Sequence, residues 1–323
     1  MFKIDKTNIN IKRVHILVGV PGSGKSTWAK AQGLRIVSSD DIRFDLFGDL
    51  NNRDIYVKEN HAKVFMEAYR LAREYVDLGI DFIWDSTNLT RKKRYKLYDF
   101  FIDLGYTVHM HIFTAPLSVL ISRTAIREEN SIDAKTVKDM YTMMESPSLY
   151  NERRDCDIYT IHNAVPFFKR GFNEYKFISY AHDNGIIKAL DLLHPLYKKE
   201  IKDIRLSHDT PYHLESISEH IDLCIKNSYN DIATFISVFH DLGKSITKNG
   251  GKYYGHERIS AMYSLMADRG LAYRMATEAI FHHMHAHGGI SEKVIRKHGL
   301  TSLTLGYIEM FRKIDDKSRI TEE

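Results

Sequence analysis

The sequence has little cysteine, no long apolar run and little excess charge. Its two cysteines, Cys156 and Cys224, show neither metal-ligand nor disulfide-framework spacing, which indicates a reducing cytoplasm. No apolar run approaches the roughly 20 residues that span a bilayer. Residues 1–12 lack the apolar core of a signal peptide. No membrane partner is therefore expected, and the net charge of +4 permits a polyanionic substrate without requiring one.

A glycine-rich loop at residues 19–27, GVPGSGKST, follows an apolar run and precedes a helical pattern. It matches G-x-x-x-x-G-K-[ST], in which backbone N–H groups surround a phosphate chain. Lys25 would reach the β- and γ-phosphates, and Ser26 would bind Mg²⁺. The candidate nucleotide-binding residues are Gly22, Ser23, Gly24, Lys25, Ser26 and Thr27. The sequence predicts a nucleoside triphosphate site; the alternative is a chance glycine-rich turn.

Strand and helix patterns alternate through the first half of the chain. Apolar runs predict strands at residues 14–20, 34–37, 80–84, 106–113 and 158–161, with helical patterns between them. Such alternation predicts an α/β fold, a parallel sheet flanked by helices. Polar residues at the carboxyl ends of the strands would then face the nucleotide.

Two acidic residues follow these strands. Asp40 is a candidate base for an attacking hydroxyl, although Ser39, Asp40 and Asp41 would all suit a helix N-cap. Asp85 would lie in the second shell of Mg²⁺ or hold substrate, or again cap a helix. Both acids therefore have a catalytic and a structural interpretation.

Basic residues offer a second set of candidates. Arg123 and Arg127 are four residues apart and share one helical face. They would clamp phosphates from a lid helix, or form a solvated surface. The basic run at residues 91–94 is expected to be exposed, where it could contact nucleic-acid phosphates.

Taken together, these motifs resemble a known family. Residues 14 to about 150 are similar to the 5′-hydroxyl polynucleotide kinase domain of the bacteriophage kinase-phosphatase family. The matches are residues 22–29 (GSGKSTWA), 40–43 (DDIR), 85–89 (DSTNL), Arg123 and Arg127. The family's Asp-x-Asp-Gly-Thr phosphatase motif is absent from this sequence.

The resemblance implies roles for the matched residues. Asp40 would be the general base for a 5′-OH, and Arg43 would contact the acceptor's phosphate. Asp85 would lie by the acceptor, while Arg123 and Arg127 would clamp the donor phosphates. ATP and Mg²⁺ are the cofactors that it implies, in the cytoplasm of a bacterial or phage-infected cell.

At 323 residues the chain is long for one domain, and two are expected. We predict a P-loop domain at residues 1–165, a connector at 166–187 and an all-α domain at 188–323. The connector region has no glycine-serine linker, and alternates aromatic with basic residues. It would stack on single-stranded nucleic acid, or pack as a core-facing connector with a charged outer side.

The second half is helical in pattern and rich in histidine. His220 lies on an apolar helical face, and His240-Asp241 ends an apolar stripe, where burial is costly unless the pair binds something. Asp315 shares a face with apolar residues, whereas Asp316 falls on the polar side. The candidate metal ligands of this half are His220, His240, Asp241, His256, His282, His283 and Asp315. Imidazoles and carboxylates from several helices can build a metal site; purely structural histidines are the alternative.

This order resembles the HD phosphohydrolase superfamily, whose pattern is His…His-Asp…Asp. It is most similar to HD domains appended to bacterial tRNA nucleotidyltransferases, which share residues 255–257 and 282–284. The resemblance implies that the four pattern residues hold one divalent metal. Further histidines would hold a second metal or the scissile phosphate.

The remaining polar residues of this half are less specific. Lys244 would steady a phosphate. His213 is left unassigned, and His285 and His287 are expected at the surface. Nitrogen and oxygen ligands do not determine the identity of the metal, because Mn²⁺, Ni²⁺ and Co²⁺ all suit them.

The leading hypothesis is an enzyme that heals broken RNA ends. The sequence does not decide whether DNA ends are also substrates. The enzyme would phosphorylate 5′-OH ends and hydrolyse 2′,3′-cyclic phosphate or 2′-phosphate ends for a polynucleotide ligase. One alternative is a nucleoside or metabolite kinase fused to an HD nucleotide phosphohydrolase. Another is a regulatory nucleotide sensor that binds without cutting.

Overall fold

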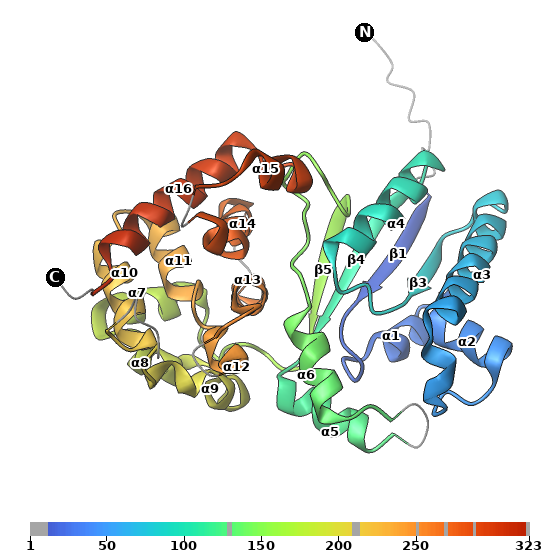
Figure 1. Cartoon of the computed structure of the whole chain (residues 1–323), viewed down its shortest axis with the longest axis horizontal. Coiled ribbons are helices and arrows are strands. Elements are labelled where there is room, and N and C mark those ends of the chain that lie inside the picture. The colour runs from blue at the N-terminus through green and yellow to red at the C-terminus, as the bar shows by residue number, and fades with distance from the viewer. Residues whose placement is uncertain are drawn as a thin grey trace, which may run out of the picture.

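The computed structural model describes residues 12–127, 131–208, 214–249, 252–267, 271–286 and 289–320. His213 and His287 lie outside these residues. A sheet flanked by helices forms one half, and a bundle of helices forms the other (Figure 1). The prediction of an α/β half followed by a helical half is confirmed at this level.

The first half contains a five-stranded sheet in the order β2-β3-β1-β4-β5, and all its strand pairs are parallel. The strands are β1 (Arg13–Val18), β2 (Arg35–Ser38), β3 (Phe82–Asp85), β4 (Thr107–Thr114) and β5 (Ile158–Asn163). The helices are α1 (Lys25–Ala31), α2 (Ser39–Phe47), α3 (Lys58–Asp77), α4 (Arg91–Asp103), α5 (Leu117–Ala125) and α6 (Ala134–Thr142). A short 3₁₀ helix, η1 (Arg53–Tyr56), precedes α3.

The two faces of the sheet are covered differently. Because side chains alternate along a strand, Val14 and Ile16 of β1 face a core that includes α3 and α4. Leu17 faces the opposite side, where it packs with Ala29 of α1 and Phe113 of β4. The second cluster is much smaller than the first, so the α1 side of the sheet has only a small apolar cover among the described residues.

The regular elements described in the second half are all helices. They are α7 (Glu174–Asn184), α8 (Ile186–Ala189), η2 (Leu190–Leu192), α9 (Pro195–Ile201), η3 (Lys202–Arg205), α10 (Ile217–Asn227), α11 (Asp231–Phe239), α12 (Lys244–Thr247), α13 (His256–Met266), α14 (Leu271–Ala286), α15 (Glu292–His298) and α16 (Ser302–Lys317). Helix α14 packs against α11, α13 and α16. Helix α7, from the predicted connector, packs against α10 and α11 and buries Phe177 completely. The domain boundaries themselves stay a prediction.

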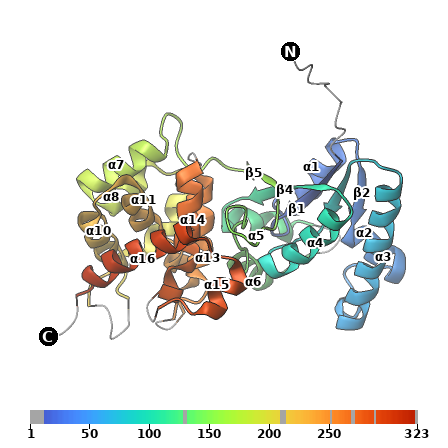
Figure 2. The same cartoon turned by 90° about the horizontal axis from the view of Figure 1, so that it is seen from above.

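The two halves meet along a packed junction. Helix α13 contacts α6 and β5, and Figures 1 and 2 show α13 and α15 on the side of the bundle that faces the sheet. One apolar cluster contains residues of both halves. The junction is therefore part of the protein's core.

The predicted exposure of the basic run at residues 91–94 is wrong for two of its four members. Arg91 and Arg94 are buried, and only Lys92 and Lys93 are exposed. Helical spacing places the two arginines on one inward face. Arg94 Nε donates to Asp155 Oδ2 at 2.9 Å, and Arg91 donates to acceptors across the junction. Burial is tolerated because these charges are paired and hydrogen-bonded.

Among the described residues, no helix is both long enough and apolar enough to cross a membrane.

Candidate functional sites

The phosphate loop closes around its own lysine. Gly22 and Gly24 have φ angles of 84° and 99°, which favour glycine. The Nζ atom of Lys25 donates to the Gly19 carbonyl at 2.8 Å and to the Val20 carbonyl at 3.2 Å. Burial lowers the pKa of Lys25 to about 8, although Asp85 and Asp40 act against this shift. The ammonium is thus held inside the loop where a phosphate chain would lie.

A hydroxyl and a carboxylate meet beside this lysine. The Ser26 hydroxyl donates to Asp85 Oδ2 at 2.7 Å. Asp85 ends β3, which pairs with β1, and the loop follows β1. Burial raises the pKa of Asp85, while Lys25 and Ser26 lower it. Mg²⁺ prefers such oxygen ligands beside a phosphate chain, so Ser26 and Asp85 fit a Mg²⁺ site.

Asp40 lies at the start of α2 and points partly into solvent. Its carboxylate is 56% exposed and accepts from Arg43 Nη1 at 3.0 Å. The N-cap of α2 is Ser38, whose side chain accepts from the Asp41 amide, so Asp40 does not fill the capping role that the sequence left open. The buried Arg43 also lies 3.3 Å from His61 Nδ1. The structure therefore holds Asp40 through a fixed guanidinium.

The two candidate lid arginines lie over the loop from α5 and the residues after it. Arg123 Nη1 donates to the Gly22 carbonyl at 3.2 Å. Arg127 is close enough for its charge to lower the pKa of Lys25. Both arginines are exposed, and their phosphate-clamping role stays a prediction.

A buried group of imidazoles and carboxylates occupies the helical half. Within it, ligand atoms of His220, Cys224, His240 and Asp315 lie within 4.8 Å of one another. A second set, Asp241, His256 and His283, meets the same limit. We call both sets together the histidine–aspartate cluster.

Close contacts join this cluster. His220 Nε2 lies 2.9 Å from Asp315 Oδ1, and His256 Nε2 lies 3.3 Å from Asp241 Oδ1 and 3.1 Å from His283 Nε2. His240 Nε2 and Asp241 Oδ2 are 3.3 Å apart and join the two sets. Asp316, by contrast, pairs with Arg312 at the surface. Five predicted ligands besides Asp315 are thus brought together.

Some members of the cluster have the electrostatics of metal ligands, whereas hydrogen bonding to Asp315 outweighs burial and raises the pKa of His220 to about 12. His240 Nε2 and Asp241 Oδ1 are buried without a hydrogen-bond partner in the described part of the chain, an arrangement that is costly unless something binds. Burial holds the pKa of His283 well below its usual value, and nearby His256 adds to this shift. Burial opposes a charge on Asp241, yet His240 and Lys244 keep its pKa well below its usual range. A neutral imidazole and an ionised carboxylate are the ligand forms that a divalent metal requires.

Of the two remaining predicted residues, His282 lies outside the cluster and Lys244 reaches it. His282 Nε2 lies 3.7 Å from Glu278 Oε2, and its ring lies 4.7 Å from that of His298 at the junction. His282 is in neither ligand set, because adjacent helical residues point about 100° apart. Lys244 Nζ donates to Asp241 Oδ2 at 2.6 Å, so it reaches the cluster.

The structure adds residues that sequence reasoning missed. His208 Nε2 lies 3.9 Å from Asp241 Oδ2, and Glu215 Oε1 lies 3.3 Å from His220 Nδ1. Cys224 Sγ lies 3.6 Å from His220 Nε2. His208 and Glu215 belong to no motif. Cys224 shares the apolar face of His220 at i+4, which was the one available signal.

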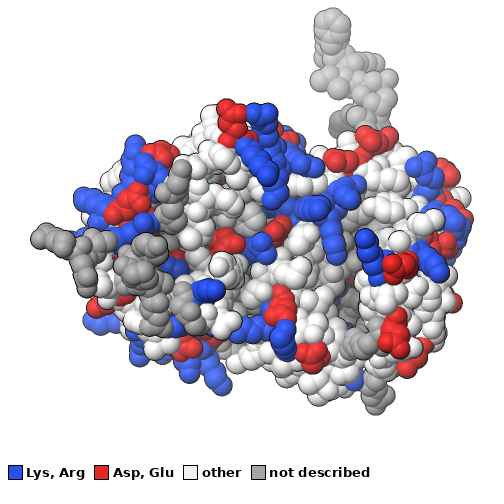
Figure 3. Space-filling view, in the orientation of Figure 1, with Lys and Arg blue, Asp and Glu red and all other residues white. Residues whose placement is uncertain are grey.

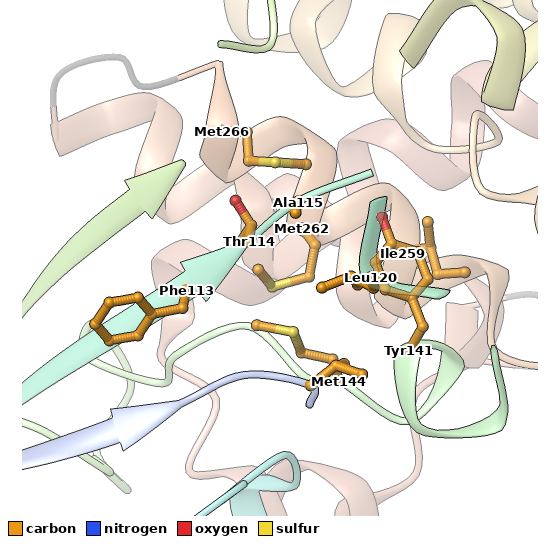
Figure 4. Close-up of a pocket in the computed structure, with 10 residues that line it drawn as sticks. Phe113, Thr114, Ala115, Leu120, Tyr141, Met144, Ile259, Met262 and Met266 are labelled. Carbon is orange, nitrogen blue, oxygen red and sulfur yellow. The ribbon is translucent and has the colours of Figure 1, made fainter. Parts of the chain in front are cut away.

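One helix connects the two sites. Helix α13 begins at His256 of the cluster. Further along it, Met262 and Met266 line a small apolar pocket with Phe113 and Thr114 at the end of β4, and Val20 of the phosphate loop borders the same pocket (Figure 4). Helix α13 therefore reaches from the cluster to the apolar pocket beside the phosphate loop.

The fold and the loop define the first half as a P-loop α/β domain, followed by a helical region that carries the histidine–aspartate cluster. Residues 14–147 match a family model described as an AAA domain. Among solved structures, the chain is similar to a candidate kinase from Chloroflexus aurantiacus, with 16% identity and a TM-score of 0.37. That similarity covers 53% of this chain and 97% of the other.

Proposed function

We propose that the protein is a bifunctional enzyme that heals broken RNA ends. Its P-loop domain phosphorylates 5′-OH ends with ATP. Its helical domain acts as an HD phosphohydrolase and removes a 2′,3′-cyclic phosphate or 2′-phosphate. The observation that carries the proposal is the presence of two separate polar sites in one chain. In the first site, Ser26 of the phosphate loop bonds to Asp85, and Arg43 fixes the nearby Asp40. The second site gathers the buried ligand atoms of the histidine–aspartate cluster.

A basic surface along the junction of the two halves favours a polynucleotide substrate. Blue side chains gather where α15 approaches α4, along the junction of the two halves (Figure 3). The exposed basic residues of these elements and of the segment before β5 are Lys92, Lys93, Lys96, Arg153, Arg154, Lys293, Arg296 and Lys297. Burial, then the charges of Arg43 and Lys93, lowers the pKa of His61, so Lys93 lies near the pair of Arg43 and Asp40. A phosphate backbone would gain from such a surface, whereas a free nucleoside would not reach it.

In the kinase step, the chain's own residues supply positioning and charge. Lys25, with Arg123 and Arg127, balances the charge of the transferred phosphoryl group. Asp40 accepts the proton of the attacking 5′-OH, and Arg43 keeps its carboxylate oriented. The oxygen–phosphorus bond to the new acceptor forms as the bond to the leaving diphosphate breaks.

In the hydrolytic step, His220, His240, Asp241 and Asp315 would hold one divalent metal, with His256 and His283 beside it. When bound, this metal supplies a water of lowered pKa. Lys244 lies against Asp241, where it balances negative charge on the phosphate. His208 and Glu215 orient Asp241 and His220 from outside, as outer groups do around metal ligands.

One RNA tests both activities. An oligonucleotide with a 5′-OH and a 2′,3′-cyclic phosphate is incubated with ATP and Mg²⁺, and separately with Mn²⁺, Ni²⁺ or Co²⁺. We expect a 5′-phosphate in the first case and loss of the cyclic phosphate in the second. Transfer of labelled γ-phosphate to free nucleosides alone would instead support a nucleoside kinase. Absence of any phosphoester cleavage would support a regulatory sensor.

A further inference from the structure

A second group of histidines lies in the sheet, far along the chain from the histidine–aspartate cluster. Register pairs His15 of β1 with His109 of β4. His111 follows two residues later and so points to the same face as His109. This is the face of the sheet that α1 covers. Three imidazoles from two adjacent strands therefore gather on one side of the sheet.

The distances between these imidazoles suit a shared ion. One ring nitrogen from each of His15, His109 and His111 lies within 4.8 Å of the others. His15 Nδ1 and His111 Nε2 are 2.9 Å apart. Two nitrogens bound to one Zn²⁺ at about 2.0–2.1 Å are separated by roughly 3.0–3.4 Å. Small rotations of the side chains would bring all three into a first coordination shell.

Outer groups orient two of the rings. His111 Nδ1 lies 3.0 Å from His162 Nε2 of β5, and His109 Nε2 lies 2.9 Å from Thr160 Oγ1. If His111 Nδ1–H donates to His162, then His111 Nε2 keeps its lone pair for a ligand. Such a partner on the far nitrogen is typical of metal-binding histidines.

The surroundings also keep these imidazoles neutral. Burial, and then the charge of neighbouring histidines, lowers the pKa of His109 to about 4 and that of His111 to about 2. Burial lowers the pKa of His15 as well. His15 and His109 are half-buried, and only His111 is buried. The two half-buried rings are therefore within reach of an ion from solvent.

We propose that His15, His109 and His111 form a binding site for a first-row transition-metal ion of the Zn²⁺ type. Imidazole nitrogen is a preferred ligand of such ions. Three protein ligands leave a fourth coordination position for water or another ligand. The ion ties β1 to β4 beside α1, because Trp28 of α1 lies with its ring 4.3 Å from that of His111. The same ion would thereby brace the helix that follows the phosphate loop.

Metal content tests this site in the full-length protein. After dialysis against Zn²⁺ and then metal-free buffer, wild type is compared with His15→Gln and His109→Gln by elemental analysis. We expect each variant to lose one equivalent, while His182→Gln, at an exposed position of α7, loses none. The two single variants alter half-buried positions separately, so misfolding of one leaves the other as a test. Equal zinc content in wild type and a folded variant overturns the proposal.

Quenching of tryptophan fluorescence by Cu²⁺ locates the ion. Trp28 contacts His111, whereas Trp84 packs in the core on the opposite face of the sheet. We expect tight quenching that survives Asp241→Asn, weakens at least about tenfold in His109→Gln, and disappears in Trp28→Phe. Quenching that depends on Asp241 rather than His109, or that needs millimolar Cu²⁺, overturns the proposal.

Discussion

The guanidinium of Arg91 and the carboxylate of Glu278 are 2.7 Å apart, although 187 positions separate them in the chain. Arg91 Nη1 makes a second bond to the other carboxylate oxygen at 3.0 Å, so the pair is bidentate. Both side chains are at most 2% exposed. Arg91 begins α4 of the sheet domain, and Glu278 lies in α14 of the bundle. This buried ion pair thus joins the two halves across their junction.

Replacing Arg91 by Met should destabilise the protein by about 3–5 kcal/mol, because Glu278 is left buried without its ionic partner. Urea denaturation followed by circular dichroism measures the change. Lys92→Met, at the exposed neighbouring position, should shift the free energy of unfolding by less than about 0.5 kcal/mol. Equal effects of both variants would show that the Arg91–Glu278 pair contributes nothing specific.

Triphosphate affinity should fall as pH rises above about 8, because the pKa of Lys25 is lowered to about 8 in the free protein. Below that pH the ammonium is already present and can pair with phosphates. Above it, each binding event must first take up a proton, at a cost of up to about tenfold per pH unit. Calorimetry in buffers of different ionisation enthalpy should detect proton uptake at pH 9. Lys25→Arg, which stays charged, should lose this pH dependence even if its affinity is lower.

Asp40→Asn should reduce transfer to 5′-OH ends by about 10²–10⁴-fold, because the amide cannot accept the proton of the hydroxyl. Asp41→Asn is the matched control: it is adjacent, exposed and similar in charge. Phosphoesterase activity should be unchanged in both variants. If Asp41→Asn were the more damaging of the two, the assignment of the base would move to Asp41.

Asp241→Asn should abolish hydrolysis of cyclic phosphate ends and lower the metal content of the helical half. The neutral amide removes a charge from the centre of a cluster in which Asp241 lies 3.3 Å from both His240 and His256. Asp316→Asn, a surface carboxylate on α16, is the control and should retain both metal and activity. Kinase activity should stay within about twofold of wild type. Loss of both activities in a folded Asp241→Asn protein would refute the two-site arrangement.

Local patterns in the sequence determined the first half of the fold and one choice between two candidate metal ligands. The phosphate loop, the five strands and their parallel pairing follow from short-range signals, because a buried parallel strand is a run of apolar residues ending in a turn. The same reasoning separated Asp315 from Asp316, since helical periodicity puts only one of them on the apolar face. The structure places Asp315 in the core and Asp316 in solvent.

Tertiary structure decided what depends on distant partners. Arg91 and Arg94 look like surface cations in sequence and are buried because acceptors from other segments satisfy their donors. Which of His282 and His283 enters the cluster depends on the rotation of α14 against its neighbours. The histidine site of the sheet required the strand order itself, because only adjacency of β1 and β4 brings His15 to His111. A site formed by one continuous motif could be predicted from the sequence. A site formed by residues from distant segments could not, because only the tertiary structure brings those residues together.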